Sequence, residues 1–408
     1  MSENYRTTAG YPIPTGVTKG ILMLCGSMTI MGSVMVAPVI PKIIQHFAEA
    51  ESAALLVQLA ITGPALAISL FSPLAGLLAD RLGRKRLLML ATLCYALLGA
   101  APYLVQQLPS LVGARVMFGV AEAVVMTCCM TLIGDYWHDQ QRLGVINLQV
   151  ITIGLVGTLL YLVGGWIGQD SWRNPFLLYL IPLLLIPLMA KYLFEPPRSA
   201  AGSGRPTMPG HTVAWKPLFA GYSAIFFGMV LAFVVPIQSP FLLMSIGVSS
   251  TLEFAALSGW SLFISLAGSL LWPTLHRRLG IAATNGVTFM LFGCSIFFMC
   301  HAGSYAQMLI AVTFHGIACG LFPPNAMAPV MAALPDRARA RGMGCFTSLL
   351  YLGQFLSPVL VAVLMPASAE LRFALHVIAL MALIYALTWF VAVATRRNGA
   401  AASPHSNH

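Results

Sequence analysis

The stretch GLLADRLGRKRLL, residues 76–88, is the most informative part of this sequence. The segment before it, residues 55–79, carries no charged side chain, and apolar residues resume at Leu87. Between the two runs, within seven positions, lie Asp80, Arg81, Arg84, Lys85 and Arg86. A connection this short and this basic is typical of a cytoplasmic loop between two membrane helices. The stretch therefore predicts two transmembrane helices joined by a tight turn.

Three residues of this loop have predicted structural roles. Gly76 would allow another helix to approach closely, and Gly83 would supply the positive φ that ends the preceding helix. Asp80 stands at a helix end opposite several cations, which predicts a polar latch on the cytoplasmic side. The alternative is that these charges only set the topology of the loop.

The bulk composition indicates the class of protein. Hydrophobic residues make up 58% of the 408 residues, charged residues only 8%, and the mean hydropathy is +0.84. Soluble domains carry about 25% charged residues. Because a membrane-spanning helix needs roughly 20 apolar residues, a chain of this length accommodates about 12 spans with short loops. The composition predicts an all-α polytopic membrane protein.

The net charge of +10 is explained by topology, so no nucleic-acid partner is expected. Of the 22 Lys and Arg residues, all but Lys42, Arg115, Arg173 and Arg372 fall in the termini and loops expected in the cytoplasm. This positive-inside distribution predicts that both termini are cytoplasmic. The eight cysteines lie in apolar segments without the Cys and His spacing of a zinc site, so no metal or other cofactor is expected.

The 76–88 stretch closely resembles the signature G-x-L-a-D-r-x-G-r-k-x-x-l of the Major Facilitator Superfamily, found between that family's second and third helices. The chain matches this signature at Gly76, Leu78, Ala79, Asp80, Arg81, Gly83, Arg84, Lys85 and Leu88. The resemblance implies twelve helices in two pseudo-symmetric six-helix bundles, with the binding site at their interface. A shift of 197 residues agrees with such a repeat, because it aligns Gly83 with Gly280 and Gly119 with Gly316. We expect bundles at 1–194 and 217–396, a cytoplasmic linker at 195–216 and a cytoplasmic tail at 397–408.

The fourth predicted span, residues 111–133, carries the ionisable pair Arg115 and Glu122. The two residues are seven positions apart, about two helical turns, and therefore share a face. Ionisable side chains at membrane depth usually face a cavity or a partner. A carboxyl group in an apolar cavity disfavours its charged form, so Glu122 can bind and release a proton, and Arg115 would favour the charged form when the cavity closes. The alternative is a static structural pair.

The same span resembles a second superfamily pattern, R-x-x-q-G-x-g-a-a, through Arg115, Gly119 and Ala123, with Phe118 at the usual Gln. The acidic residue that ends this helix in the family corresponds to Asp135. The resemblance implies that a latch, including the start of the eleventh helix near residues 342–346, stabilises the outward-facing state. The predicted latch residues are Gly76, Asp80, Arg81, Gly83, Arg84, Arg86 and Asp135.

The superfamily plan implies that helices 1, 2, 4, 5, 7, 8, 10 and 11 line the substrate cavity. Polar, aromatic and thioether side chains on these helices are the candidate lining residues. For each of them the alternative is helix packing or contact with lipid. The candidates are Gln58, Met31, Met126, Asn147, Gln149, Tyr161, Phe233, Gln238, Trp260, His315 and Gln354.

No ATP-binding P-loop and no hydrolase motif occurs in the sequence, so we expect a secondary transporter and not an enzyme. The resemblance to the 12-helix drug/proton antiporter branch implies proton-coupled efflux of small amphipathic organic compounds by alternating access. One alternative is proton-coupled uptake or uniport of a small organic solute, and another is a membrane-embedded enzyme, channel or receptor. The expected partners are a small-molecule substrate, protons and the lipid bilayer, for a monomer in a bacterial inner membrane.

Overall fold

The structure is a computed structural model that describes residues 14–137, 139–196, 213–365 and 370–401. Its internal contacts divide the chain into two compact units, Met1–Pro209 (unit 1) and Gly210–His408 (unit 2). All regular secondary structure in the described ranges is helical. Most of the predicted linker at 195–216 lies outside the described residues.

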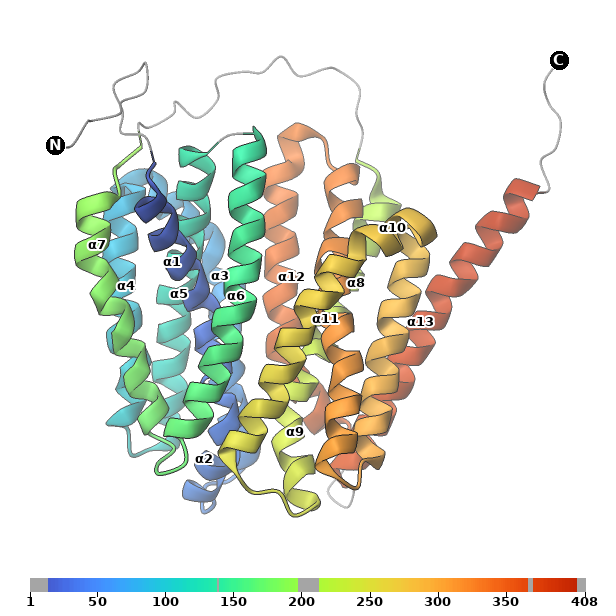
Figure 1. The fold of residues 1–408 in the computed structure, drawn as a ribbon, viewed down its shortest axis with the longest axis horizontal. Helices are drawn as coiled ribbons and strands as arrows, with labels where there is room; N and C mark the ends of the chain where they lie inside the picture. Colours follow the sequence, from blue (N-terminus) through green and yellow to red (C-terminus); the bar gives the residue numbers. More distant parts are fainter. Residues whose placement is uncertain (1–13, 138, 197–212, 366–369, 402–408) are drawn as a thin grey trace. The chain divides into compact units, whose positions relative to one another are not determined.

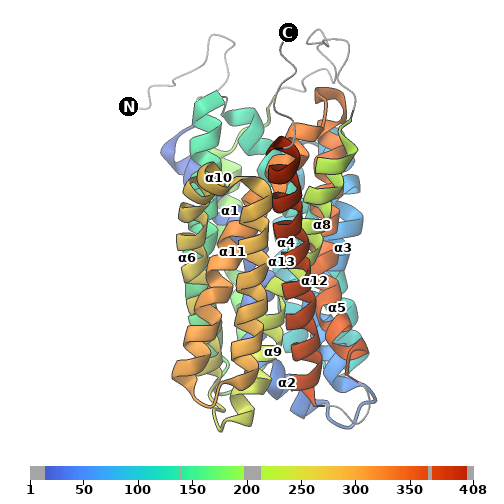
Figure 2. The ribbon, with the colours of Figure 1, turned by 90° about the vertical axis from the view of Figure 1, so that its right-hand side faces the viewer.

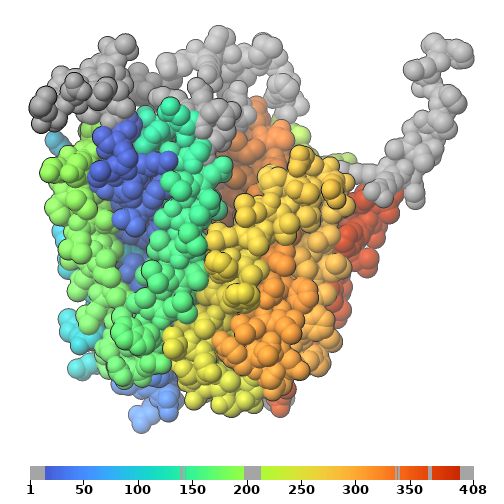
Figure 3. Space-filling model, viewed as in Figure 1, coloured from blue at the N-terminus to red at the C-terminus, as the bar shows by residue number. Residues whose placement is uncertain are grey.

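The described residues of unit 1 form seven α-helices and three 3₁₀ segments (Figure 1). Helix α3 packs against α5, α4 packs against α5, and α1 packs against α5 and α6. In Figure 3, α1 is visible between α6 and α7 near one end and is covered by other helices further along. The elements are α1 (Gly16–Val34), η1 (Ala37–Val39), α2 (Ile40–His46), α3 (Ala53–Leu82), α4 (Arg84–Ala100), η2 (Ala101–Tyr103), α5 (Leu108–Tyr136), α6 (Asp139–Ile167), η3 (Asn174–Leu184) and α7 (Leu185–Tyr192).

The first span is broken after Val34, where α1 ends and the chain continues as η1 and α2. Pro38 and Pro41 lie just beyond the break, and each lacks the backbone N–H that a continuous helix would need. The last four carbonyl groups of α1, those of residues 31–34, therefore have no regular helical partner. These carbonyl groups are available to side chains of neighbouring helices.

In the part of unit 2 that the structure describes there are six α-helices, and α11 lies beside α10 (Figure 2). Its core is rich in buried phenylalanine, including Phe254, Phe289, Phe292 and Phe322. The elements are α8 (Trp215–Ala232), α9 (Val234–Ser245), α10 (Thr251–His301), α11 (Tyr305–Ala333), α12 (Asp336–Val363) and α13 (Leu371–Ala401).

The number of spans agrees with the sequence-based expectation. Eleven helices of the described ranges are long and apolar enough to cross a membrane. One of them, α10, has 51 residues and changes direction at Gly280, whose φ is 75° and ψ is 174°. Counted as two spans, α10 brings the total to twelve. The predicted all-α polytopic fold is confirmed.

The 197-residue repeat is visible in the geometry of each unit. Gly83 and Gly280, which the shift superimposes, both have positive φ values, 93° and 75°. A ring contact also recurs: the ring centroids of Tyr95 and Phe118 are 4.5 Å apart in unit 1. The equivalent residues of unit 2, Phe292 and His315, have ring centroids 5.4 Å apart.

Two helix boundaries differ from the expectation. The charged residues Asp336, Arg337, Arg339 and Arg341 predict a cytoplasmic loop before the eleventh span. In the structure, residues 336–341 instead form the first turns of α12, because Ala and Arg are strong helix formers and the helix begins directly after Pro335. Helix α13 continues to Ala401, five residues into the segment expected as a tail. Residues 402–408 lie outside the described part of the chain.

Candidate functional site

A cluster of charged side chains surrounds the Gly83 turn between α3 and α4. Arg84, the first residue of α4, forms an ion pair with Asp80 of α3, with Nη2 and Oδ1 3.0 Å apart. Its Nη1 pairs with Asp135 near the end of α5. The Asp80 side chain is 66% exposed, whereas the Asp135 and Arg84 side chains are 26% exposed. Arg84 therefore joins the ends of α3 and α5, and its less exposed partner is Asp135.

Glu195 completes this cluster, although sequence reasoning assigned it to the linker. Its Oε1 accepts a hydrogen bond from the Arg84 backbone N–H at 2.5 Å, and its Oε2 accepts one from Lys85 N at 3.1 Å. A Cβ atom at Gly83 would lie 3.0 Å from the Glu195 carboxylate carbon, so the glycine leaves room for the side chain. A carboxylate at a helix N-terminus is favoured by the helix dipole and by the unpaired N–H groups there.

The residues before Glu195 are held by Tyr136 at the end of α5. The Tyr136 hydroxyl donates to the Phe194 carbonyl oxygen at 2.5 Å and accepts from Phe194 N at 3.0 Å. The two rings stack with centroids 4.2 Å apart. The segment that follows the sixth span is therefore fixed to the ends of α4 and α5, next to Arg84.

The other predicted latch residues have different surroundings. Arg81 and Arg86 are exposed. A Cβ at Gly76 would meet only Thr127, at 3.9 Å, so the helices of unit 1 do not make the close approach predicted there. The predicted contact with the start of the eleventh helix would join the two units and stays a prediction.

Arg115 of α5 is 1% exposed and serves as a link between helices. Its Nη2 donates to the Gly32 carbonyl oxygen near the end of α1, which also accepts from the Tyr179 hydroxyl at 3.0 Å. Its Nε donates to the Ala60 carbonyl oxygen of α3 at 3.3 Å, and its Nη1 lies 3.4 Å from the Tyr179 hydroxyl. The guanidinium carbon lies 4.6 Å from the centre of the Phe118 ring. Arg115 therefore contributes to packing within unit 1.

Glu122, two turns further along α5, is 2% exposed and points at the backbone of α1. A Cβ atom at Gly32 would lie 2.8 Å from one of its carboxylate oxygens and 2.9 Å from the other. Within the described residues no basic side chain forms an ion pair with Glu122, Arg115 included. A buried carboxylate without a countercharge is costly, and a bound proton or cationic group removes this cost.

The candidate cavity residues of unit 1 differ in burial. Met31, Gln149 and Tyr161 are buried, Gln58 and Met126 are half-buried, and Asn147 is exposed. Gln149 packs onto Gly26 of α1, where any side chain would overlap its amide nitrogen. Two polar side chains, Gln149 and Glu122, thus lie over glycines of the same helix.

The candidates of unit 2 are also mostly buried. His315 of α11 is 3% exposed, and its Nδ1 lies 2.8 Å from the Ser261 hydroxyl of α10, so it is a hydrogen-bonded interhelical residue. Gln238 and Gln354 are buried, and Phe233 is half-buried at the junction of α8 and α9. Trp260 is 42% exposed and donates its indole N–H to the Thr313 hydroxyl at 2.9 Å. That the candidates of both units line one cavity stays a prediction. No group of three His, Cys, Asp or Glu side chains suited to a metal ion occurs within the described ranges.

Comparisons with known proteins agree with this architecture. The chain is 25% identical over 301 residues to the 3-(3-hydroxy-phenyl)propionate transporter of Escherichia coli (strain K12). The aligned region covers 70% of this chain and 72% of that protein. The chain is also 23% identical over 343 residues to the Multidrug efflux protein YfmO of Bacillus subtilis (strain 168), covering 81% and 82%. The fold is similar to the crystal structure of a D-xylose-proton symporter, with a TM-score of 0.72 and 16% identity over 91% of this chain and 96% of that one. The model of the Major Facilitator Superfamily matches residues 22–299 and 282–407, and the chain therefore belongs to this superfamily.

Proposed function

We propose that this transporter moves small amphipathic organic compounds by alternating access and that Glu122 couples their movement to protons. The observation that carries the proposal is the position of the Glu122 carboxyl group, which is 2% exposed, lies against Gly32 and has no ion-pair partner in the described residues. A carboxyl group in this position exchanges its charge by binding and releasing a proton. Arg115 joins α1, α3 and α5 near the Glu122 carboxyl group.

The charge of the substrate sets the direction of coupling at such a site. A cationic group and a proton compete for the Glu122 carboxylate, which produces antiport and hence efflux. An organic anion is repelled by the carboxylate and binds once Glu122 is protonated, which produces cotransport and hence uptake. Efflux of amphipathic compounds is our first proposal, and the relative named as a multidrug efflux protein supports it. Uptake of an aromatic acid is the second, supported by the relative named as a 3-(3-hydroxy-phenyl)propionate transporter.

Proton movement in everted membrane vesicles tests this function. Vesicles containing the protein are energised, and a pH-sensitive dye is followed while lipophilic cations, neutral amphipathic compounds and aromatic carboxylates are added in turn. For an efflux antiporter, a transported compound dissipates the proton gradient, and the effect saturates with concentration. Absence of any response, with the protein folded and inserted, would contradict proton coupling. A non-saturating ion flux would indicate a channel.

The position of the carboxylate against Gly32 yields a specific prediction. In Gly32→Ala, the added methyl group would contact both Glu122 oxygens at under 3 Å, so the carboxylate must move. We expect a decrease in proton-coupled transport of at least tenfold. Gly20→Ala, on the same helix but with nothing within 4 Å of its Cβ position, is the matched control and should transport normally. Equal activity of the two variants in the vesicle assay would mean that the position of Glu122 is unimportant.

We also propose that the charged cluster around Arg84 is the predicted latch and that it favours one conformation of the transporter. Because Asp135 is the less exposed partner of Arg84, Asp135→Asn should lower turnover several-fold and more than Asp80→Asn does. The amount of protein in the membrane should not change. The exposed Glu51→Gln serves as a control for the loss of one negative charge. Normal turnover in Asp135→Asn would leave these charges with a role in topology alone.

A further inference from the structure

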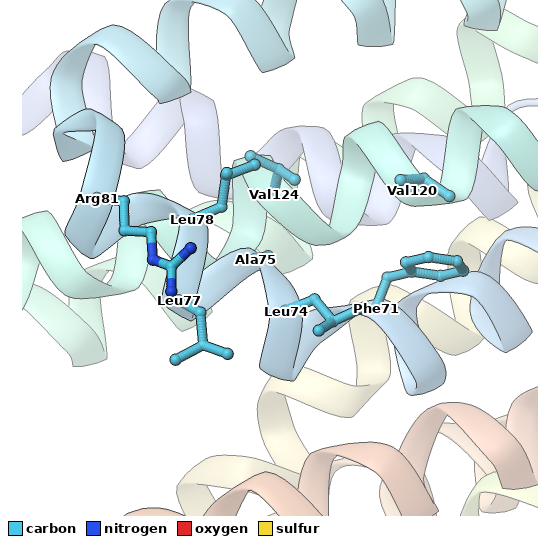
Figure 4. Close-up of a pocket in the computed structure, with 8 residues that line it drawn as sticks. All are labelled: Phe71, Leu74, Ala75, Leu77, Leu78, Arg81, Val120 and Val124. Carbon is cyan, nitrogen blue, oxygen red and sulfur yellow. The ribbon is translucent and has the colours of Figure 1, made fainter.

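A groove on the surface of unit 1 runs between α3 and α5 (Figure 4). Its volume is about 340 Å³, within the range of roughly 300–1,000 Å³ that is common for small-molecule sites. Seven of its eight lining residues are apolar, and the eighth is a cation. The lining residues are Phe71, Leu74, Ala75, Leu77, Leu78, Arg81, Val120 and Val124.

The groove owes its shape to the sizes of neighbouring side chains. Ala75 is 3% exposed, and its small side chain leaves space between the two helices. Leu74 and Leu77 of α3 are 55% and 62% exposed and stand on one side of this space. Val120 and Val124, four residues apart and so on one face of α5, line the other side. The result is a concave apolar surface that protein side chains of unit 1 do not fill.

The length of the groove matches the depth of one membrane leaflet. Phe71 and Arg81 are ten residues apart on α3, or about 15 Å at a rise of about 1.5 Å per residue. The hydrocarbon core of a bilayer is about 30 Å thick, so one leaflet spans about 15 Å. Arg81 lies at the end of α3, beside the Gly83 turn that the sequence places on the cytoplasmic side. The apolar part of the groove therefore corresponds to acyl chains and its cation to the headgroup level.

We propose that this groove binds an anionic phospholipid of the cytoplasmic leaflet. One acyl chain lies between α3 and α5 from Phe71 to Leu78, and the phosphate group lies at Arg81. Anionic lipids are attracted to basic residues at this interface. A peptide segment fits the groove less well, because its backbone N–H and C=O groups would face seven apolar side chains without hydrogen-bond partners.

Native mass spectrometry of the purified full-length protein tests the headgroup part of this proposal. The protein in detergent is titrated with dioleoyl-phosphatidylglycerol or with dioleoyl-phosphatidylcholine, which have the same acyl chains. We expect the anionic lipid to bind about fivefold more tightly, because one basic residue near an anionic headgroup contributes about 1 kcal/mol of binding free energy. Arg81→Gln should remove the preference, and Arg86→Gln, an equal charge change at an exposed residue outside the groove, should retain it. Equal binding of the two lipids, or equal losses in both variants, would overturn the proposal.

A second pair of variants tests the acyl-chain part. Val120→Phe partly fills the groove and should weaken binding of both lipids, whereas Met117→Phe, at a 55% exposed position of α5 outside the groove, should not. Glycerol phosphate, which has the headgroup charge but no chains, should not compete. Competition by glycerol phosphate would indicate a simple anion site, and competition by a transported compound would assign the groove to the substrate. Either result would contradict the lipid assignment. If Val120→Phe does not fold, the comparison of Arg81→Gln with Arg86→Gln still tests whether an anionic lipid binds at Arg81.

Discussion

Glu122→Gln is expected to abolish substrate-induced proton movement in everted vesicles, a decrease of at least a hundredfold. Glutamine has nearly the same shape as glutamate and fits the space beside Gly32, but its amide group neither binds nor releases a proton at physiological pH. The variant should therefore fold and reach the membrane in normal amounts. Glu49→Gln, at an exposed position of unit 1, is the matched control and should behave as the wild type.

The same variant separates coupling from transport. Downhill exchange of a labelled compound between two sides of a membrane requires substrate binding and alternating access, but no net proton transfer. We expect Glu122→Gln to retain such exchange while it loses accumulation driven by a pH gradient. Gradient-driven accumulation that persists in this variant would show that the proton binds elsewhere.

Arg115→Met is expected to lower the free energy of unfolding by about 3 kcal/mol. The substitution removes the donor to the Ala60 carbonyl oxygen, and a buried carbonyl group left unpaired costs roughly 1–3 kcal/mol. The Gly32 carbonyl oxygen loses one of its two donors and keeps the Tyr179 hydroxyl at 3.0 Å, and the contact of the guanidinium with the Phe118 ring is lost as well. Arg115→Lys should lose less stability, because an ammonium group can still reach one acceptor but cannot join two helices as the guanidinium does.

Thermal unfolding in detergent, followed with a thiol-reactive dye, provides the measurement. Cys25, Cys128 and Cys129 are all buried in unit 1, so they react when that unit opens. Arg86→Met removes the same charge from an exposed position and should unfold as the wild type does. If the Arg115→Met variant unfolds at the same temperature as the wild type, the structural role assigned to this residue is contradicted.

The parts of the fold that depend on local sequence were predictable. The uncharged apolar segments define the spans, and Gly83 defines the turn between α3 and α4, because only glycine adopts its φ of 93° easily. The break in the first span follows from Pro38 and Pro41. The start of α12 was not predicted, since a run of basic residues suggested a loop although Arg and Ala favour a helix.

The sequence singles out the residue types of the candidate site but not their contacts, and the role of the site stays a proposal. A single carboxyl group in the apolar fourth span identified Glu122, yet the glycine that it faces depends on the rotation of α1 about its axis. Helical spacing suggested Arg115 as its partner, whereas the guanidinium binds two backbone carbonyl groups. The Gly32 carbonyl is available because α1 ends nearby, and the Ala60 carbonyl is available because Pro64, four residues later in α3, has no backbone N–H. Glu195 contacts Arg84 across 111 residues, and no local pattern marks such a contact.

Proton release or uptake upon binding tests the central claim most directly. The purified protein is placed in a weakly buffered detergent solution with a pH dye, and compounds from the vesicle panel are added. We expect a transported cation to release up to one proton per wild-type molecule, and a transported aromatic carboxylate to cause proton uptake. Glu122→Gln should bind the same compound without any proton change. A proton change that is equal in the wild type and in Glu122→Gln would contradict the assignment of Glu122 as the proton site.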